Sequence, residues 1–302
     1  MQKSPQTIFN YETAFSRTIG LVTPQELQLL RSKRVAIAGM GGVGGAHLLT
    51  LTRLGIGHFH LADFDEFEIH NFNRQAGAYL SNIGRLKVDV MGEMASAINS
   101  ELDLTFFKTG VTAENLEAFF KNVDVYVDGL DFFAFKARKM VFDYCYQHKI
   151  PIVTAGPIAM GAALLNFLPT GMSPSTYFNW KDTDTDEELG MKFLLGLTPS
   201  MPHLRQMIVP SSVNFKEHRG PSTPMGCELC AGVAGTEVMK ILIQRGRVKS
   251  APHSIHFDAF ENSLHSKYIW FGNRNPWQKI KIAFALRHLR KQDFTKTVAK
   301  SA

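Results

Sequence analysis

Apolar and polar positions along this 302-residue chain predict short strands that alternate with helices. The β-branched and alanine run from Val35 to Ala38 predicts a buried strand, and leucines at 48, 49, 51 and 54 then recur at helical spacing. Strands that alternate with helices favour an α/β, Rossmann-like fold with a mostly parallel sheet and helices on both of its faces. Similar runs predict further strands at 58–62, 102–108, 123–127, 151–155 and 253–257.

Helical patterns fill much of the remaining chain. The sequence Thr23-Pro24-Gln25-Glu26 has the residues of a capping box and predicts a helical N-terminal arm over residues 1–33. The acidic run at 182–188 indicates a helix start or a solvated face, and 160–168 is a further apolar run. Other helices are expected at 84–99, at 112–121 with Thr112 as N-cap, at 132–148 and at 226–243.

The turn after the first strand contains five glycines within residues 39–45. Gly39, Gly41 and Gly44 have the G-x-G-x-x-G spacing of a dinucleotide-binding fold, and Gly42 lies between them. Glycines let the backbone approach a phosphate closely, and the N-terminus of the next helix offers free N–H groups. The same spacing also occurs where a turn merely packs a helix on a strand, so the ligand depends on other residues.

Charge and cysteine content narrow the class of protein. The formal net charge of +6 and the pI near 9.2 suit an anionic ligand, and no signature of a nucleic-acid-binding domain is present, so we expect no nucleic-acid partner. Three cysteines do not form a disulfide framework. No signal peptide or membrane-spanning run is found, and we therefore expect a cytoplasmic protein.

Five short motifs follow one another in the first half of the chain. Together they resemble the ThiF/MoeB/HesA family of ubiquitin-activating-enzyme-like adenylyltransferases, over roughly residues 11–245. The order and spacing of the motifs are far more specific than any one of them. The motifs are Gly39-Met-Gly-Gly-Val-Gly44, Asp63-Phe-Asp65, Asn71-Phe-Asn-Arg-Gln75, Gly84-Arg-Leu-Lys87 and Gly129-Leu-Asp-Phe132.

The resemblance implies an ATP- and Mg²⁺-dependent enzyme that converts a carboxylate to an acyl-adenylate and releases pyrophosphate. The carboxylate would belong to the C-terminus of a ubiquitin-like or sulfur-carrier protein, to a peptide or to a small molecule. It also implies an adenylation domain at 34–270, with a nucleotide-binding core at 34–170 and a substrate or crossover region at 171–225. The basic and amphipathic pattern from Asn273 onward predicts, by itself, a basic amphipathic tail at 271–302.

The family pattern assigns a role to each matching residue. The glycine loop lies against the nucleotide, Asp63 binds the ribose, and Asp131 is a ligand of Mg²⁺. Asp65 is a nucleotide-site residue or a turn acid, and Gln75 is a supporting group. The residues expected to hold the phosphates are Asn71, Arg74 and Lys87.

Arg17 matches an N-terminal arginine that, in this family, reaches the ATP of the other subunit. The resemblance therefore implies a homodimer in which each subunit completes the site of its partner.

The chain departs from the family pattern in two places. Only one Cys-x-x-Cys pair is present, Cys227 and Cys230, so we expect no structural zinc; His203, His218 and His253 are the candidates that could complete such a site. Phe132 replaces the usual Asn beside Asp131, which puts nucleotide specificity or rate in doubt.

The two cysteines and the tail each have two interpretations. Cys227, or less favourably Cys230, is a candidate nucleophile for a thioester or persulfide, because a thiol near a helix N-terminus has its thiolate favoured. The alternative is that both are inert and buried. The basic tail could dock an acidic partner or a membrane surface, but a helix packed on the body with a solvated basic face is favoured.

Two other functions fit part of the pattern. An NAD-dependent oxidoreductase would explain the glycine loop and Asp63, but it leaves Arg74, Lys87 and Asp131 without a shared role. A catalytically silent relative that binds a nucleotide is consistent with Phe132 and the missing cysteine pair.

Overall fold

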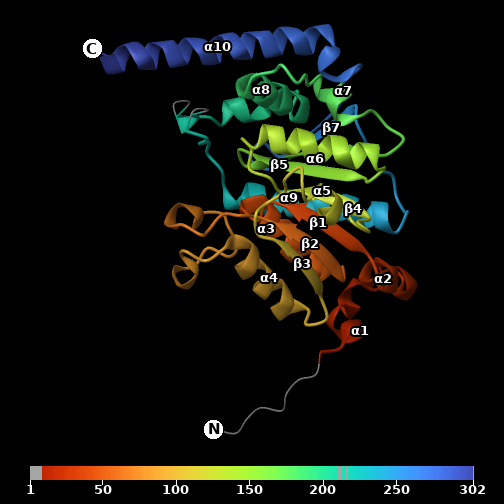
Figure 1. The fold of residues 1–302 in the computed structure, drawn as a ribbon. Coiled ribbons are helices and arrows are strands. Elements are labelled where there is room, and N and C mark those ends of the chain that lie inside the picture. The colour runs from red at the N-terminus through yellow and green to blue at the C-terminus, as the bar shows by residue number, and fades with distance from the viewer. Residues whose placement is uncertain (1–8, 210–211, 215–216, 302) are drawn as a thin grey trace.

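The fold is built on one eight-stranded sheet, seen in a computed structural model that describes residues 9–209, 212–214 and 217–301 (Figure 1). The strand order is β3-β2-β1-β4-β5-β6-β7-β8. β1 to β5 pair in parallel, and β6, β7 and β8 extend the sheet in antiparallel pairs. The strands are β1 Arg34–Ala38, β2 His58–Ala62, β3 Asp103–Phe107, β4 Val125–Asp128, β5 Ile152–Ile158, β6 Gly161–Phe167, β7 His253–Asp258 and β8 Ser263–Tyr268.

Helices cover both faces of the sheet. One face packs on α3, α4 and α9, which contribute Leu48, Met91 and Val238 to one apolar core. The other packs on α6, α7 and α8, which contribute Phe142 and Phe193 to a second core. The helices are α1 Tyr11–Ala14, α2 Pro24–Arg31, α3 Gly42–Leu54, α4 Lys87–Ile98, α5 Leu116–Phe119, α6 Phe135–Gln147, α7 Pro174–Phe178, α8 Asp186–Leu197, α9 Pro224–Leu242 and α10 Pro276–Ser301.

The first strand shows why the sheet has two cores. Val35 and Ile37 belong to the core under α3, whereas Ala36 and Ala38 belong to the core under α6, because successive side chains of a strand point to opposite faces. A strand buried on both faces reads as a continuous apolar run, which is typical of parallel sheets. The α/β fold with a largely parallel sheet is therefore confirmed, and the carboxyl ends of β1, β2 and β4 meet at one edge.

Two local expectations about helices had different outcomes. The capping box at Thr23 and Glu26 is present and starts α2. The helix expected at 112–121 with Thr112 as N-cap is wrong, since α5 spans only Leu116–Phe119. The Asn115 side chain accepts a hydrogen bond from the Thr112 N–H at 2.8 Å and donates one to the Gly110 carbonyl, also at 2.8 Å. These bonds stabilise a turn in place of helix.

The end of the sheet was only partly foreseen. The apolar run at 160–168 is the antiparallel strand β6, and the strand predicted at 253–257 is β7; a further strand, β8, follows them. The sequence pattern missed β8, whose Leu264 and Tyr268 are 62% and 45% exposed. An edge strand that buries neither face carries no apolar alternation, so periodicity cannot find it.

The acidic run after α7 starts a helix, as one of its two interpretations proposed. Thr185 caps α8 through the Glu188 N–H, and Asp186, Glu187 and Glu188 fill the first turn. Negative charge there is favourable next to the N-terminal end of the helix dipole. In the part of the chain that the structure describes, no helix is long and apolar enough to cross a membrane.

Candidate functional site

The glycine turn lies at the carboxyl edge of the sheet, between β1 and α3. Gly39 has φ +89°, and a Cβ atom on it would lie 2.1 Å from the Gly129 carbonyl oxygen. A Cβ on Gly44 would lie 1.7 Å from the Gly39 carbonyl oxygen. These positions therefore admit only glycine. The turn ends at Gly41, the N-cap of α3, so no side chain caps the first N–H groups of the helix.

Asp63 ties this turn to the end of β2. Its Oδ2 accepts a hydrogen bond from the Met40 N–H at 2.5 Å, and its Oδ1 accepts one from the Asp65 N–H at 2.7 Å. The side chain is only 8% exposed. Burial raises the pKa of this carboxyl, and the two N–H bonds oppose that shift. The expected ribose-binding acid is thus held rigidly beside the glycine turn.

Lys87 begins α4 and points to the same edge. Its Nζ lies 2.9 Å from Asp65 Oδ2, and the lysine side chain is 9% exposed against 53% for the aspartate. The Lys87 N–H also donates to the Asp65 carbonyl at 2.8 Å. Asp65 therefore pairs with and orients the largely buried ammonium group of Lys87. The sequence had left open whether Asp65 is a nucleotide-site residue or a turn acid.

The segment with Asn71, Arg74 and Gln75 covers the other side of the glycine turn. Asn71 is buried, and its carbonyl accepts hydrogen bonds from the Arg74 and Gln75 N–H groups at 3.1 and 3.0 Å. Arg74 Cγ would lie 3.2 Å from a Cβ on Gly42. The Arg74 guanidinium donates to the His70 carbonyl and to Asn73 Oδ1. Arg74 therefore lies beside the turn, whereas the Asn71 side chain accepts a hydrogen bond from the Glu68 N–H at 2.9 Å.

Gln75 carries an unsatisfied polar atom at this place. Its Oε1 is buried and makes no hydrogen bond within the described chain, while its Nε2 would lie 3.8 Å from a Cβ on Gly41. A buried acceptor without a donor is unfavourable, so a ligand or water that donates a hydrogen bond here would be stabilised.

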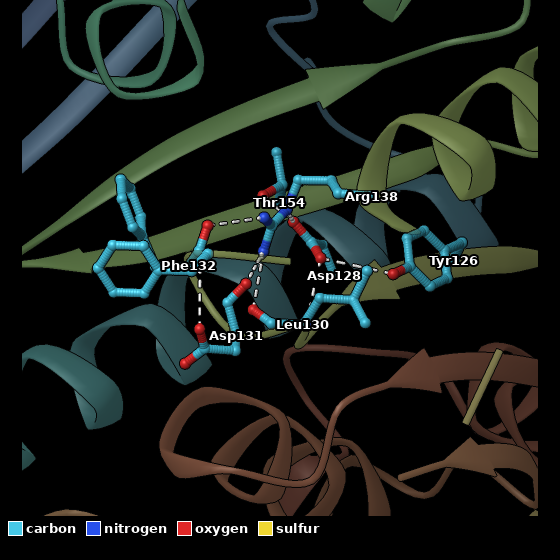
Figure 2. A network of polar contacts seen from close by, with 8 residues as sticks. Tyr126, Asp128, Leu130, Asp131, Phe132, Arg138 and Thr154 are labelled. Carbon is cyan, nitrogen blue, oxygen red and sulfur yellow. Dashed lines mark hydrogen bonds and ion pairs between the residues drawn. The ribbon is translucent and has the colours of Figure 1, made fainter. Parts of the chain in front are cut away.

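Asp131 lies on the loop that follows β4, two residues beyond Gly129. Its side chain is exposed, and its Oδ1 accepts a hydrogen bond from the Phe133 N–H at 2.9 Å (Figure 2). One exposed carboxylate fits Mg²⁺, which takes one or two carboxylates together with substrate phosphates and waters. Among the described residues, no group of three or more His, Cys, Asp or Glu side chains could hold a metal by itself.

A buried ion pair that the sequence analysis missed organises this loop. Arg138 Nε lies 2.9 Å from Asp128 Oδ2, and both side chains are at most 3% exposed. The Arg138 Nη atoms donate to the carbonyls of Leu130, Asp131 and Phe132 at 2.8 to 3.1 Å, as Figure 2 shows. The only signal in the sequence was an arginine on the apolar side of a helical pattern.

The two cysteines lie within the first two turns of α9. Cys227 Sγ would lie 2.9 Å from a Cβ on Gly42, so the thiol contacts the glycine turn. Burial nevertheless raises the pKa of Cys227, although Ser222 and Arg74 oppose this, and raises the pKa of Cys230 well above its usual value. The expected stabilisation of a thiolate by the helix N-terminus is therefore outweighed by desolvation.

Of the three histidines considered as zinc ligands, two pack against aromatic rings and the third is buried in a short helix before α9. The His218 ring stacks on Phe133 at 5.2 Å, and the His253 ring meets Tyr268 edge-on at 4.6 Å. His203 is buried at η4 (Pro202–Arg205).

Arg17 lies far from the other predicted residues within one chain. It belongs to η1 (Ser16–Thr18) and is exposed. The arm that carries it packs on the C-terminal end of α3, where the Tyr11 hydroxyl donates to the Gly55 carbonyl at 2.6 Å. A helix of 13 residues such as α3 is about 20 Å long, which separates this end from the glycine turn.

A model of the ThiF family matches residues 15–276, which is most of the chain. The tRNA threonylcarbamoyladenosine dehydratase of Haemophilus influenzae is 34% identical over 150 residues, 49% of this chain and 57% of that protein. The sulfur carrier protein ThiS adenylyltransferase of Escherichia coli is 28% identical over 160 residues, 53% of this chain and 63% of that protein. The chain thus spans little more than half the length of these relatives.

Solved structures with the same architecture include PaaA. Its TM-score is 0.65 at 18% identity, and the match covers 88% of this chain and 78% of PaaA. At this identity the similarity establishes the fold alone.

Proposed function

Because the chain belongs to the ThiF family, we propose that it is an ATP-dependent adenylyltransferase that activates a carboxylate. One observation carries the proposal: segments from five places in the chain converge on the glycine turn. Met40 of the turn donates a hydrogen bond to Asp63, and Gly42 lies against Arg74 and Cys227. Gly39 and Gly44 lie against Gly129 of the Asp131 loop, and Lys87 is connected to the turn through Asp65. An oxidoreductase would use the glycine turn and Asp63 but not the two cations.

In the proposed reaction, a carboxylate oxygen of the substrate attacks the α-phosphorus of ATP. The bond between the α-phosphorus and the bridging oxygen breaks, and the electron pair leaves with pyrophosphate. The products are an acyl-adenylate and pyrophosphate. Catalysis of this kind rests on positioning and on stabilisation of the developing negative charge.

Each side chain has a role that its surroundings allow. Asp63 accepts hydrogen bonds from the ribose, and the N-terminus of α3 faces the phosphates. Arg74 and Lys87 stabilise negative charge on the phosphates, with Asn71 holding the segment that carries Arg74. Asp131 would hold Mg²⁺, which supplies charge neutralisation when it is bound. No covalent thiol step is included, because burial disfavours the thiolate of Cys227.

We also propose that two subunits complete each site. Arg17 cannot serve its own glycine turn, from which it is separated by the length of α3. The loop at 64–83 exposes large apolar side chains, with Ile69 at 70% and Leu80 at 80%. Large apolar side chains left exposed along one loop are typical of an interaction surface. It supports a homodimer in which Arg17 reaches the nucleotide of its partner.

The region at 171–225 supplies the substrate side of the proposed site. Asn73 Nδ2 donates to the Ser222 carbonyl at 3.0 Å, and His218 stacks on Phe133 beside the Asp131 loop. The end of this region therefore lies over the nucleotide residues. We propose that its remaining part selects the carboxylate, which belongs to a sulfur-carrier or ubiquitin-like C-terminus, a peptide or a small molecule.

ATP–pyrophosphate exchange tests the proposal. With a matching carboxylate, the protein should exchange labelled pyrophosphate into ATP, and Lys87→Ala and Asp131→Ala should each lower the rate by about 10²-fold or more. The exposed Lys121→Ala should leave it unchanged. Candidate carboxylates should include the modified tRNA nucleoside named in the Haemophilus relative. Binding of NAD without binding of ATP would overturn the proposal, and ATP binding without exchange for any carboxylate would favour a silent relative.

A further inference from the structure

Within the described side chains, which end at residue 289, the C-terminal helix α10 contacts the body through one face. Gln278 is 3% exposed and donates a hydrogen bond to the Leu195 carbonyl of α8 at 2.9 Å. Lys281 Nζ donates to the Pro199 carbonyl at 2.8 Å, and Ile282 is 8% exposed. In Figure 1 the helix runs along the outside of α8, at the end of the molecule opposite α1. The start of α10 is thus fixed, and its other face looks away from the protein.

That outer face is apolar. Trp277, Ile280 and Phe284 are 74%, 59% and 73% exposed, and their spacing of three and four residues places them in one line along the helix. The His288 ring stacks on Phe284 at 6.5 Å and extends the line by one turn. The contacts that hold α10 in place come from Gln278, Lys281 and Ile282 on another side of the helix, so this exposed apolar line is not needed for them.

The charge of the chain is concentrated around this helix. Of the 33 Lys and Arg residues, nine lie in residues 263–302, whereas only one of the 27 acids does. The rest of the chain therefore carries a small net negative charge. Arg274, Lys279 and Arg287 are exposed among the described residues of this part. Positive charge beside an exposed apolar line attracts an anionic partner more than a neutral or cationic one.

We propose that α10 is an interfacial helix that binds an anionic lipid membrane. A helix that lies flat on a membrane buries an apolar line with Trp and Phe at the level of the headgroups, while Lys and Arg beside the line attract anionic lipids. Trp277, Ile280 and Phe284 with the flanking basic residues match this pattern. An RNA partner would use the basic residues and the aromatic rings but has no use for exposed Ile280, because recognition there depends on stacking and phosphate contacts. This binding is independent of the adenylation chemistry.

Vesicle sedimentation of the full chain tests the proposal. The protein should bind vesicles of phosphatidylcholine that contain about one anionic phosphatidylglycerol in three lipids. It should bind vesicles of pure phosphatidylcholine at least fivefold less. Trp277→Ala with Phe284→Ala should lower the partition coefficient at least tenfold. Arg274→Glu with Arg287→Glu should do the same. The emission of Trp277 should shift to the blue on binding, and the shift should be lost in Trp277→Phe.

Matched variants distinguish this surface from general stickiness or charge. Phe260→Ala removes an aromatic ring that is 59% exposed elsewhere, and Arg53→Glu with Lys121→Glu reverses two exposed charges elsewhere; neither should change the partition coefficient. Equal binding to both vesicle types, or equal losses in the control variants, would overturn the proposal. So would binding of bulk tRNA that depends on Trp277 and Phe284 in a protein that does not bind the vesicles.

Discussion

At the scale of single residues, the candidate site is a set of contacts made around glycines. Gly42 has Cys227 Sγ and Arg74 Cγ within 2.9 and 3.2 Å of the place a Cβ would take. Lys87 is held by Asp65 at 2.9 Å. A small change at Gly42 or Asp65 therefore displaces Arg74 or Lys87, the two cations of the proposed phosphate site.

Gly42→Ala should weaken ATP binding about 10- to 100-fold, because the new methyl group pushes on Arg74 and on the thiol of Cys227. Isothermal titration with ATP measures the effect. In a Cys227→Ala background the same change should cost less, since one of the two clashing atoms is gone. Additive effects in this double-mutant cycle would show that the thiol does not limit the space at the turn.

Asp65→Asn should lower the pyrophosphate exchange rate about tenfold while changing the free energy of unfolding by less than about 1 kcal/mol. The carboxylate is 53% exposed, so solvent screens the stability term, but the position of Lys87 depends on it. Asp89→Asn, in the exposed Lys108–Asp89 pair, is the matched control and should leave the exchange rate as it was. A large loss of stability with unchanged exchange would contradict this role.

At the scale of elements, α6 positions the loop after β4 through one side chain. Arg138 pairs with Asp128 at the end of β4 and caps the Leu130, Asp131 and Phe132 carbonyls. Thr154 on β5 donates to the same Asp128 oxygen at 2.8 Å, so two strands and a helix share the pair. The position of the proposed Mg²⁺ ligand thus depends on a buried network.

Arg138→Met should lower the free energy of unfolding by about 3–5 kcal/mol, because it leaves the buried Asp128 charge without a partner. Arg138→Lys can keep the ion pair but loses the carbonyl contacts, so its loss should be about 1–3 kcal/mol. Urea unfolding followed by circular dichroism measures both. Arg53→Lys, on the surface of α3, should have no effect, and equal losses in the two Arg138 variants would contradict the network.

At the scale of the whole molecule, four buried histidines among the described residues make the fold sensitive to acid, and burial lowers the pKa of one of them, His60, as well. Burial lowers the pKa of His47 to about 3 and the pKa values of His203 and His256 to about 4. Unfolded histidines have a pKa near 6.5, so the unfolded chain binds more protons below that pH. The stability that these neutral rings contribute is complete above pH 6.5 and is lost as the pH falls toward 4.

The free energy of unfolding should therefore decrease as the pH falls from 6.5 to 4, with His47 contributing a slope of about 1.4 kcal/mol per pH unit. His47→Met should reduce the slope by that amount, because the buried group no longer titrates. Urea titrations at several pH values measure this. An unchanged slope in the variant would show that His47 is not the buried base.

How far the sequence predicts the site depends on whether a signal is local. The glycine turn, the capping box at Thr23 and the order of Asp63, Arg74, Lys87 and Asp131 are all local patterns, and the fold class follows from the alternation of strand and helix periods. Periodicity failed at 112–121, where the Asn115 side chain bonds the backbone, and at β8, where both faces are exposed. Neither a side-chain hydrogen bond to the backbone nor an exposed edge strand changes the spacing of apolar residues along the sequence.

By itself the sequence determined the α/β core and the residues of the glycine turn, because strand and helix periods and the steric freedom of glycine act over a few neighbouring residues. Only the tertiary structure decided which groups are buried together. Packing raised the pKa of Cys227 through burial, brought Arg138 against Asp128, and left Trp277, Ile280 and Phe284 of α10 exposed. These outcomes depend on which distant segments exclude water from a side chain, and that is a property of the packed chain.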